Sequence, residues 1–299
     1  MATQDAVEQK AVVIPRRGYM PRSKSARELS GKLISYTLLT LGSILIMIPV
    51  FWMVSSALKP NSQIFIFPPQ WIPNPIQWEN FVTAMTSLPF GTYFQNTMII
   101  EVGSIVGTVL SCSIVAYGFA RLNAPGRNFW FVVLLSTMML PGVVTMIPVY
   151  LIFRQLGWVN TFLPLIVPNF FGSAFFIFLL RQFFMTIPRD FEEAARIDGA
   201  NTWQVLTRIM LPLSKPALAT VTIFTFMGVW NDFMGPLIYL NKPETYTLAL
   251  GLNFFKGQYV SQWNLLMAAS LVMMLPLVLL FFVAQKAFIE GITLTGVKG

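Results

Sequence analysis

The stretch from Leu33 to Leu58, LISYTLLTLGSILIMIPVFWMVSSAL, contains no charged residue and decides the class of fold. An α-helix rises about 1.5 Å per residue, so about 20 apolar residues span the roughly 30 Å of hydrocarbon in a bilayer. This stretch is therefore long enough to cross a membrane as one helix. It is too long for the apolar region of a cleaved signal peptide and no small-residue cleavage site follows it, so we expect it to stay as an anchor.

Five further stretches meet the same criterion, which predicts an all-α polytopic membrane protein with six transmembrane helices. Prolines interrupt several of them, and such breaks are tolerated where a neighbouring helix or a cavity satisfies the freed backbone groups. Simple kinking and a role in gating are both open for these prolines. The six predicted spans are Leu33–Leu58, Thr97–Ala120, Phe129–Phe153, Thr161–Leu180, Ala217–Leu240 and Leu265–Val283, and the prolines are Pro141, Pro148, Pro164, Pro168 and Pro276.

The composition of the whole chain agrees with a membrane protein. Hydrophobic residues make up 55% of the 299 positions and charged residues 11%, whereas a soluble domain carries about 25% charged residues. The net charge of +8 could suggest nucleic-acid binding, but the basic residues lie at the ends of apolar spans rather than on one solvated face. The chain has no histidine, and its single cysteine, Cys112, lies in an apolar run, so we expect neither a metal site nor a histidine base.

The distribution of Lys and Arg predicts the orientation. If the N-terminus lies in the cytoplasm, sixteen of the 20 Lys and Arg residues fall in cytoplasmic segments and four fall outside. This bias is the positive-inside pattern, so both termini are expected in the cytoplasm. Residues 1–32 would form a basic cytoplasmic tail, and residues 33–299 the transmembrane domain. On the outer side, the loop sequence IFPPQWIPNPIQW indicates a stiff segment at the lipid–water interface.

The longest cytoplasmic connection, at about residues 185–216, is far longer than two antiparallel helices need. Pro188 and Asp190 are favourable residues at a helix start, and the acidic residues after them suit the positive first turn. Gly199 is placed to end this helix as the residue just past its C-cap. The sequence therefore predicts a short helix followed by a glycine turn.

A second helix is predicted directly after that turn. Asn201, with Gln204 three residues later, indicates a capping box, and Pro212 is expected to stop the helix. An apolar stripe along the helix is expected to be buried and to stiffen the hairpin. The hairpin could lie on the membrane surface or dock on a partner protein, and its alanines favour docking because alanine is a poor membrane anchor. The stripe consists of Trp203, Val205, Leu206, Ile209 and Met210.

The segment EEAARIDGANTWQVLTRIMLP closely resembles the EAA loop of ABC-importer permeases. That motif is Glu-Ala-Ala, three residues, Gly, nine residues, Ile, one residue, Leu-Pro, and this chain matches every position without a gap. In this family the loop forms a coupling helix that docks in a groove on a separate ATPase subunit. The residues predicted to form the coupling loop here are Glu193, Ala194, Ala195, Gly199, Trp203, Ile209, Leu211 and Pro212.

Other segments are similar to the maltose-type sugar permeases, and the resemblance covers roughly Leu33 to Gly299. NTMIIEVGSIVGTVLSCSIVAYGFARLNAPGR resembles the second span and the turn after it, VWNDFMGPLIYL the fifth span, and QKAFIEGITLTGVKG the C-terminal tail. The tail from Lys286 is then either a frayed end or a segment that reaches the ATPase pair. The outer loop Asn241–Asn264 is either an interfacial aromatic belt or a lip that meets a docked binding protein. Its aromatic residues are Tyr246, Phe254, Phe255, Tyr259 and Trp263.

The resemblance implies the smaller permease of an ABC importer in a bacterial or archaeal cell (inner) membrane. Its partners would be membrane lipid, a second homologous permease, two ATPase subunits and an extracellular or periplasmic solute-binding protein, with no nucleic acid. The chain has no GxxxxGK[ST] phosphate loop, so we expect no catalytic residue and no bound cofactor, and the partner subunits would bind ATP and Mg. The implied cargo is a sugar, a di- or oligosaccharide, and another solute is the alternative.

Few charges lie inside the predicted spans, which agrees with a neutral cargo and argues against an ion-coupled secondary transporter. Only Glu101 and Asp232 are embedded, and a bare carboxylate at mid-depth costs at least about 2.5 kcal/mol. Asp232 adjoins Trp230 and Asn231 at an expected helix break before Gly235, which makes these residues a candidate translocation path. Asp232 could instead hold the structure through a backbone donor or a residue of the partner permease. Glu101 either lines the path or reaches to the outer interface.

Overall fold

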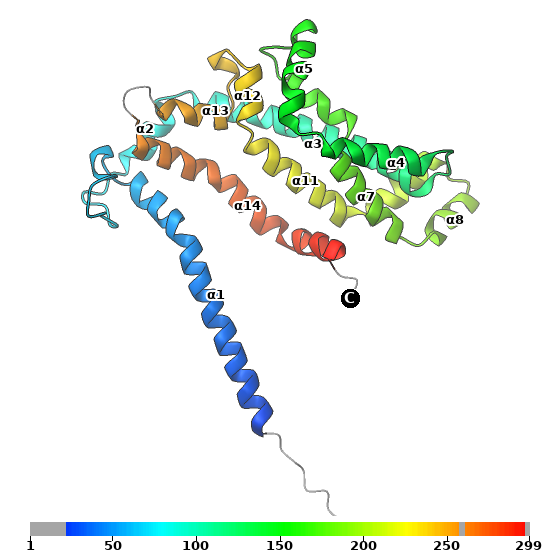
Figure 1. Cartoon of the computed structure of the whole chain (residues 1–299), viewed down its shortest axis with the longest axis horizontal. Coiled ribbons are helices and arrows are strands. Elements are labelled where there is room, and N and C mark those ends of the chain that lie inside the picture. Colours follow the sequence, from blue (N-terminus) through cyan, green and yellow to red (C-terminus); the bar gives the residue numbers. More distant parts are fainter. Residues whose placement is uncertain (1–21, 257–260, 297–299) are drawn as a thin grey trace, which may run out of the picture. The chain divides into compact units, whose positions relative to one another are not determined.

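A computed structural model of the protein describes residues 22–256 and 261–296, with side chains described at 29–256 and 261–285 (Figure 1). These residues contain no strand, only an isolated bridge between Lys256 and Ser261, so the all-α prediction is confirmed. The α-helices are α1 (Arg22–Ala57), α2 (Glu79–Thr86), α3 (Phe90–Arg121), α4 (Arg127–Ser136), α5 (Gly142–Gln155), α6 (Leu163–Ile166), α7 (Ala174–Thr186), α8 (Asp190–Ile197), α9 (Thr202–Val205), α10 (Leu211–Leu213), α11 (Lys215–Trp230), α12 (Met234–Tyr239), α13 (Leu248–Leu252) and α14 (Trp263–Gly296). Short 3₁₀ turns are η1 (Asn61–Gln63), η2 (Thr137–Met139), η3 (Val167–Phe171), η5 (Pro243–Thr245) and η6 (Asn253–Phe255), and η4 (Leu206–Met210) is a π-helix.

The chain divides into two compact units, Met1–Trp52 and Met53–Gly299. The described part of the first unit is the helix α1 up to Trp52, whose apolar side chains are exposed around the helix. A helix that is apolar all round belongs in lipid or against other membrane helices, which agrees with the predicted anchor. Most of the tail predicted for residues 1–32 lies outside the described residues, and α1 already begins at Arg22.

Among the described residues, four helical stretches are long and apolar enough to cross a membrane, and two bent helix pairs would raise the number to six. The multi-pass architecture is therefore confirmed, while the count depends on whether each bent pair is one span. The predicted third span is one of these pairs, with a bend of 97° between its halves. Pro141 stands at the bend, immediately before α5. The four stretches are Leu29–Ala57, Phe90–Arg121, Leu163–Thr186 and Trp263–Gln285.

The predicted fifth span, Ala217–Leu240, is interrupted, and the helix break expected before Gly235 is confirmed. Helix α11 ends at Trp230, and α12 begins only at Met234. Pro236 has no N–H with which to bond the carbonyl four residues earlier, so an unbroken helix would lose a hydrogen bond at this point. The second bent pair instead joins α11 to the preceding stretch, residues 202–213, at an angle of 80°.

Helix α3 is central to the second unit, where it contacts α7, α11 and η3 (Figure 1). Its serines satisfy the backbone of the irregular α6–η3 segment. Ser104 Oγ donates to the carbonyl of Leu165 at 3.3 Å, and Ser111 Oγ donates to that of Asn169 at 3.0 Å. Such bonds allow a broken helix at membrane depth, as expected where a neighbouring helix covers the freed groups.

Two apolar clusters form around different parts of α3. The first cluster joins the end of α3 to α7, α9, η4 and α11, and the second joins its start to α2, α13 and α14. The cytoplasmic connection predicted from the sequence is thus packed onto the first cluster. The buried members of the first cluster are Cys112, Ala116, Tyr117, Ala120, Ile177, Leu180, Phe184, Val205, Leu206, Met210, Ala217 and Val221.

The proline-rich segment after α1 folds back on the residues that precede it. Lys59 is buried and donates from its ammonium to the carbonyl of Gln70, and burial lowers the pKa of Lys59. Trp71 and Trp78 remain exposed at 48% and 68%. Exposed tryptophans on a fixed loop are typical of a membrane interface, and contact with lipid there stays a prediction.

Candidate functional site

The first half of the candidate site is α8 and the turn that ends it. Gly199 has φ +84°, in the left-handed region that favours glycine. The amide of Ala200 donates to the carbonyl of Ala195 at 2.9 Å, and the amide of Gly199 donates to that of Arg196 at 3.1 Å. These two bonds form a Schellman motif, which confirms the predicted glycine turn.

The second half begins with the predicted capping box. Gln204 N donates to Asn201 Oδ1 at 2.9 Å, and Asn201 N donates to Gln204 Oε1 at 2.8 Å, so both turns of the hairpin are fixed by hydrogen bonds. The helix then passes through the π-helix η4, a form that occurs often at functional sites. The helix ends at Leu213, one residue past Pro212, and a bend of 80° separates it from α11, so the predicted stop is confirmed to within one residue.

The predicted apolar stripe is divided between the core and the surface. Val205, Leu206 and Met210 are buried in the first cluster, but Trp203 is 59% exposed. Trp203 lies in α9, before the π-helix η4, and is not buried within this chain. Its burial against a partner stays a prediction.

The structure brings all predicted coupling residues into one loop but exposes them unequally. Glu193, Ala194, Gly199, Trp203 and Pro212 are exposed, whereas the others are half-buried against the helices beneath. The half-buried residues are Ala195, Ile209 and Leu211. The exposed set forms a surface that a partner could contact without unfolding the hairpin.

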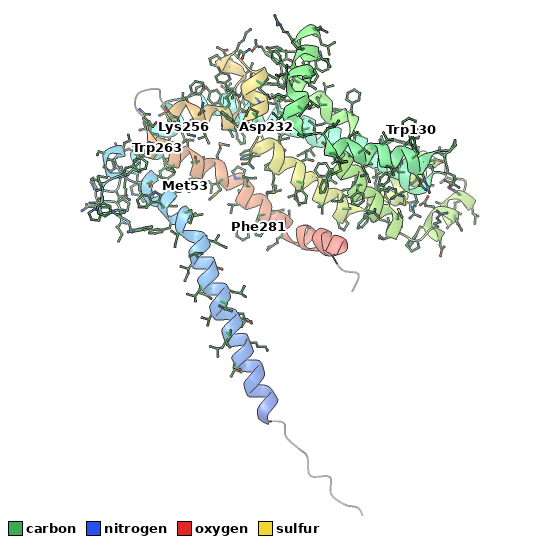
Figure 2. The ribbon with its side chains drawn as sticks, viewed as in Figure 1. Met53, Trp130, Asp232, Lys256, Trp263 and Phe281 are labelled. Carbon is green, nitrogen blue, oxygen red and sulfur yellow. The ribbon has the colours of Figure 1, made fainter. Side chains whose placement is uncertain are left out.

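The second candidate region is the break between α11 and α12, where Asp232 is located (Figure 2). Asp232 Oδ1 accepts a hydrogen bond from the amide of Gly235 at 3.0 Å, which is the pairing with a backbone donor that the sequence left open. Asp232 also lines a cavity of about 30 Å³ together with Thr97, Thr247 and other residues of α3, α11 and α12. That volume is sufficient for about one water molecule.

Trp230 and Asn231 do not join Asp232 at this cavity. Trp230 is buried, stacks on Phe226 and donates from Nε1 to the carbonyl of Met273 at 3.1 Å. Asn231 is exposed, and its side-chain amide donates to the carbonyl of Met227 at 2.8 Å. The three neighbours in sequence therefore face different surroundings, and their joint role in a path stays a prediction.

Glu101 lies about three turns into helix α3, which begins at Phe90, before the predicted start of the span at Thr97. Whether Glu101 reaches the outer interface stays a prediction. Its side chain is only 2% exposed, and neither carboxyl oxygen has a hydrogen-bond partner in the described part of the chain. A carboxyl group without a hydrogen-bond partner is costly to bury. The role of Glu101 in a translocation path stays a prediction.

Most of the described aromatics in the outer loop pack within the chain. Tyr246 stacks on Phe254 with ring centroids 5.4 Å apart, and Phe255 is buried against Phe90. Phe254 is 49% exposed, and Tyr259 lies outside the described residues. The belt and the lip are therefore both still predictions. In the C-terminal tail, α14 continues to Gly296, and residues 297–299 are not described.

Comparison with known proteins decides the family. Residues 103–293, which include the whole hairpin, match the family described as the binding-protein-dependent transport system inner membrane component. The chain belongs to this family. The permease is 35% identical to the probable ABC transporter permease protein YurM of Bacillus subtilis (strain 168), over 90% of this chain and 89% of the relative.

Several relatives carry names that state a cargo. The permease is 32% identical to the arabinooligosaccharides transport system permease protein AraQ of Bacillus subtilis (strain 168), over 86% of this chain and 92% of AraQ. It is also 32% identical to the diacetylchitobiose uptake system permease protein DasC of Streptomyces coelicolor, over 84% and 91%. Among solved structures, a bacterial ABC transporter involved in the import of the acidic polysaccharide alginate matches with a TM-score of 0.75, 25% identity and coverage of 88% of this chain and 98% of that chain.

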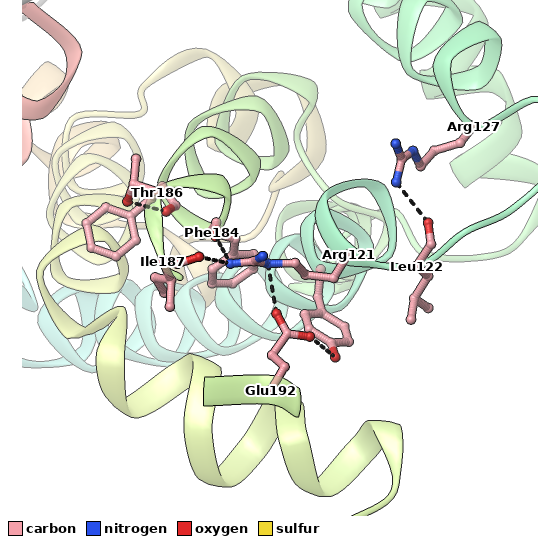
Figure 3. Close-up of polar contacts among 9 residues, drawn as sticks. Arg121, Leu122, Arg127, Phe184, Thr186, Ile187 and Glu192 are labelled. Carbon is pink, nitrogen blue, oxygen red and sulfur yellow. Dashed lines mark hydrogen bonds and ion pairs between the residues drawn. The ribbon is translucent and has the colours of Figure 1, made fainter. Parts of the chain in front are cut away.

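The sequence did not reveal how the hairpin is attached to the rest of the permease. Glu192 was expected only to favour a helix start, and Arg121 only to mark the cytoplasmic side. In the structure their side chains form a buried ion pair, with Arg121 Nε and Glu192 Oε1 2.8 Å apart (Figure 3). The sequence did contain one signal for this contact, the two adjacent glutamates Glu192 and Glu193. Only Glu193 belongs to the EAA motif, so Glu192 was left without an assigned partner.

Proposed function

We propose that this permease is the smaller of two homologous membrane subunits of an ABC importer for a di- or oligosaccharide. The observation that carries the proposal is the hairpin, in which a Schellman turn and a capping box hold Glu193, Gly199 and Trp203 in an exposed, ordered loop. Two separate ATPase subunits would bind ATP and Mg and dock on this loop. Their closure would be passed to the spans, which would then alternate between outward-facing and inward-facing states.

The proposed topology has six spans in a bacterial inner membrane, with both termini in the cytoplasm. Each bent helix pair then counts as one span or as part of one. The excess of Lys and Arg on one side supports this orientation, and the coupling loop must lie on the side where ATP is found. A solute-binding protein on the other side would deliver the cargo.

The oligosaccharide cargo is supported by the names of relatives such as AraQ and DasC. The small number of embedded carboxyl groups favours a neutral cargo, because a charged path usually shows more of them. Another solute remains the alternative, since the binding protein and the second permease normally share in selectivity. An ion-coupled mechanism is the second alternative, and it requires uptake that persists without ATP.

The proposal is tested by purifying the tagged permease from its native membranes and identifying the co-purified chains by mass. We expect a second permease, an ATPase and, after mild cross-linking, a solute-binding protein. The isolated binding protein is then tested by intrinsic fluorescence against neutral oligosaccharides, acidic oligosaccharides and amino acids. A complex without an ATPase would contradict the proposed class, and tight binding of amino acids alone would contradict the cargo.

Asp232 provides a test of the path at the helix break. Asp232→Asn keeps an acceptor for the amide of Gly235, so we expect normal assembly and a changed apparent affinity for the cargo. Asp232→Leu removes that acceptor, and a donor left without its hydrogen-bond partner costs about 1–3 kcal/mol when it is buried. Assembly is measured by co-purification and uptake by labelled oligosaccharide in cells, with Glu79→Gln on α2 as a control that removes an exposed charge outside the hairpin. Unchanged uptake in both Asp232 variants would remove it from the path.

A further inference from the structure

Helix α8 is attached to the rest of the permease through very little buried surface. Glu192 is the one residue of α8 that is buried, and Ala195 is half-buried against the first cluster. The apolar side chains Phe191 and Ile197 are 51% and 87% exposed. Packing alone therefore gives α8 little hold on the membrane helices, and the contacts of Glu192 decide how it is held.

Glu192 is bound by two residues one turn apart near the end of α3 (Figure 3). Arg121 Nε lies 2.8 Å from Glu192 Oε1, and the two side chains are 5% and 9% exposed. The N–H is not aligned for a hydrogen bond with that oxygen, so this contact is an ion pair. The hydroxyl of Tyr117 donates to Glu192 Oε2 at 3.3 Å, which orients the carboxylate from its other oxygen.

Arg121 also binds the end of a third helix. Its Nη2 donates to the carbonyl of Phe184 at 2.6 Å and to the carbonyl of Ile187, both at the C-terminal end of α7. The last carbonyls of a helix lack partners within it, and a basic side chain satisfies them. One planar guanidinium with several donors thus joins α3, α7 and α8 at a single point.

We propose that Glu192 and Arg121 form a latch that transmits movement of the coupling helix α8 to α3 and α7. This inference rests on the proposed function. Glu192 binds residues of the permease itself, whereas the adjacent, exposed Glu193 would contact the ATPase subunit. Glu192 is a positioning residue, since it touches neither nucleotide nor cargo. The second helix of the hairpin is held by apolar packing, which is non-directional. The latch, in contrast, fixes the orientation and the position of α8 relative to α3 and α7.

A buried ion pair is weak evidence for stability, because apolar residues of similar volume often replace it without loss. The latch proposal therefore makes a distinctive claim about variants. Removing both charges together should leave the fold and the assembly intact but break the connection between α8 and the membrane helices. Removing only one charge leaves the other buried without a partner, which is the more damaging change.

The single cysteine of the chain offers a reporter of this connection. Cys112 is buried in α3, and its Sγ accepts a hydrogen bond at 3.3 Å from the amide of Ser173, the residue before α7. Its reaction with a maleimide therefore depends on separation of α3 from α7. The extent of labelling can be read from the mass of this chain, whatever cysteines the partner subunits contain.

The experiment uses the purified transporter complex in lipid vesicles, without nucleotide and with ATP plus vanadate. In the wild type we expect the Cys112 labelling rate to differ between the two states by about fivefold or more, the lower end of usual coupling between sites. In the double variant Arg121→Met with Glu192→Leu, the difference should vanish while the ATPase subunits stay bound and hydrolyse ATP. In Glu192→Gln, which leaves Arg121 buried without its charged partner, the difference should vanish and assembly should be weaker than in the double variant. Glu79→Gln, which removes an exposed charge on α2 outside the hairpin, should behave as the wild type.

The outcomes separate this inference from the proposed function. The latch would be overturned if the Cys112 labelling rate of the double variant differed between the two nucleotide states as much as that of the wild type. It would also be overturned if the labelling rate of the wild type did not differ between these states. Loss of assembly in the double variant would also overturn it, because the pair would then be a requirement for folding. A wild-type permease that binds no ATPase would contradict the proposed function instead.

Discussion

Gly199→Val is expected to abolish most uptake while leaving the permease in the membrane. The structure leaves open space around Gly199, since a Cβ there would meet no atom within 4 Å. The cost is therefore one of backbone conformation, because φ is +84° and a β-branched residue is a strong outlier at positive φ. A left-handed residue other than glycine costs about 1–2 kcal/mol, which disfavours the native turn by roughly 5- to 30-fold.

A graded series at position 199 separates conformation from bulk. Asparagine visits the left-handed region more readily than other residues, so Gly199→Asn should retain more uptake than Gly199→Ala, and Gly199→Val should retain least. ATP hydrolysis by the assembled complex and uptake of the labelled cargo are measured together at matched expression. Full uptake by a well-expressed Gly199→Val variant would show that the turn has no part in coupling.

Gly251→Ala is expected to destabilise the permease and to lower its melting temperature. A Cβ at Gly251 in α13 would lie 2.5 Å from Cδ2 of Tyr93, a distance at which one of the two must move. Tyr93 is 2% exposed and its ring is packed between Phe90 and Tyr246, so it has no free space to turn into. Overpacking of this kind costs about 1–3 kcal/mol.

Gly228→Ala is the matched control for that change. Gly228 lies in α11, and an added Cβ would meet no atom within 4 Å. Replacing glycine by alanine inside a helix is favourable by roughly 0.5–1 kcal/mol, so this variant should melt at the wild-type temperature or higher. Thermal unfolding of the detergent-purified protein, followed by tryptophan fluorescence, measures both. Equal melting temperatures for the two variants would contradict the close contact between α13 and Tyr93.

The features that the sequence predicted correctly depend on neighbouring residues. The anchor near the N-terminus follows from an uninterrupted apolar stretch, which matches Leu29–Ala57 in the structure. The turn at Gly199 and the capping box at Asn201 follow from residue types at fixed, short spacing. Each of these depends on groups within one or two helical turns, so no other part of the chain is needed to predict them.

The break in the fifth span was expected before Gly235, and the structure adds which backbone donor Asp232 accepts from, the amide of Gly235. The feature that the sequence did not predict is the π-helix η4, Leu206–Met210. Trp203 precedes it and is 59% exposed, whereas Leu206 and Met210 are buried. Periodicity assumes one constant number of residues per turn, so it cannot report a local change in that number.

The sequence by itself determined that the chain is helical, crosses a membrane several times and carries the EAA motif on an ordered hairpin. Only the tertiary structure decided which of two adjacent glutamates faces inward. Glu192 and Arg121 are far apart in the chain, and they meet because packing of α3 against α7 brings the two helix ends together beneath α8. A buried charge requires a partner of opposite sign, and the identity of that partner is a property of the fold rather than of local sequence.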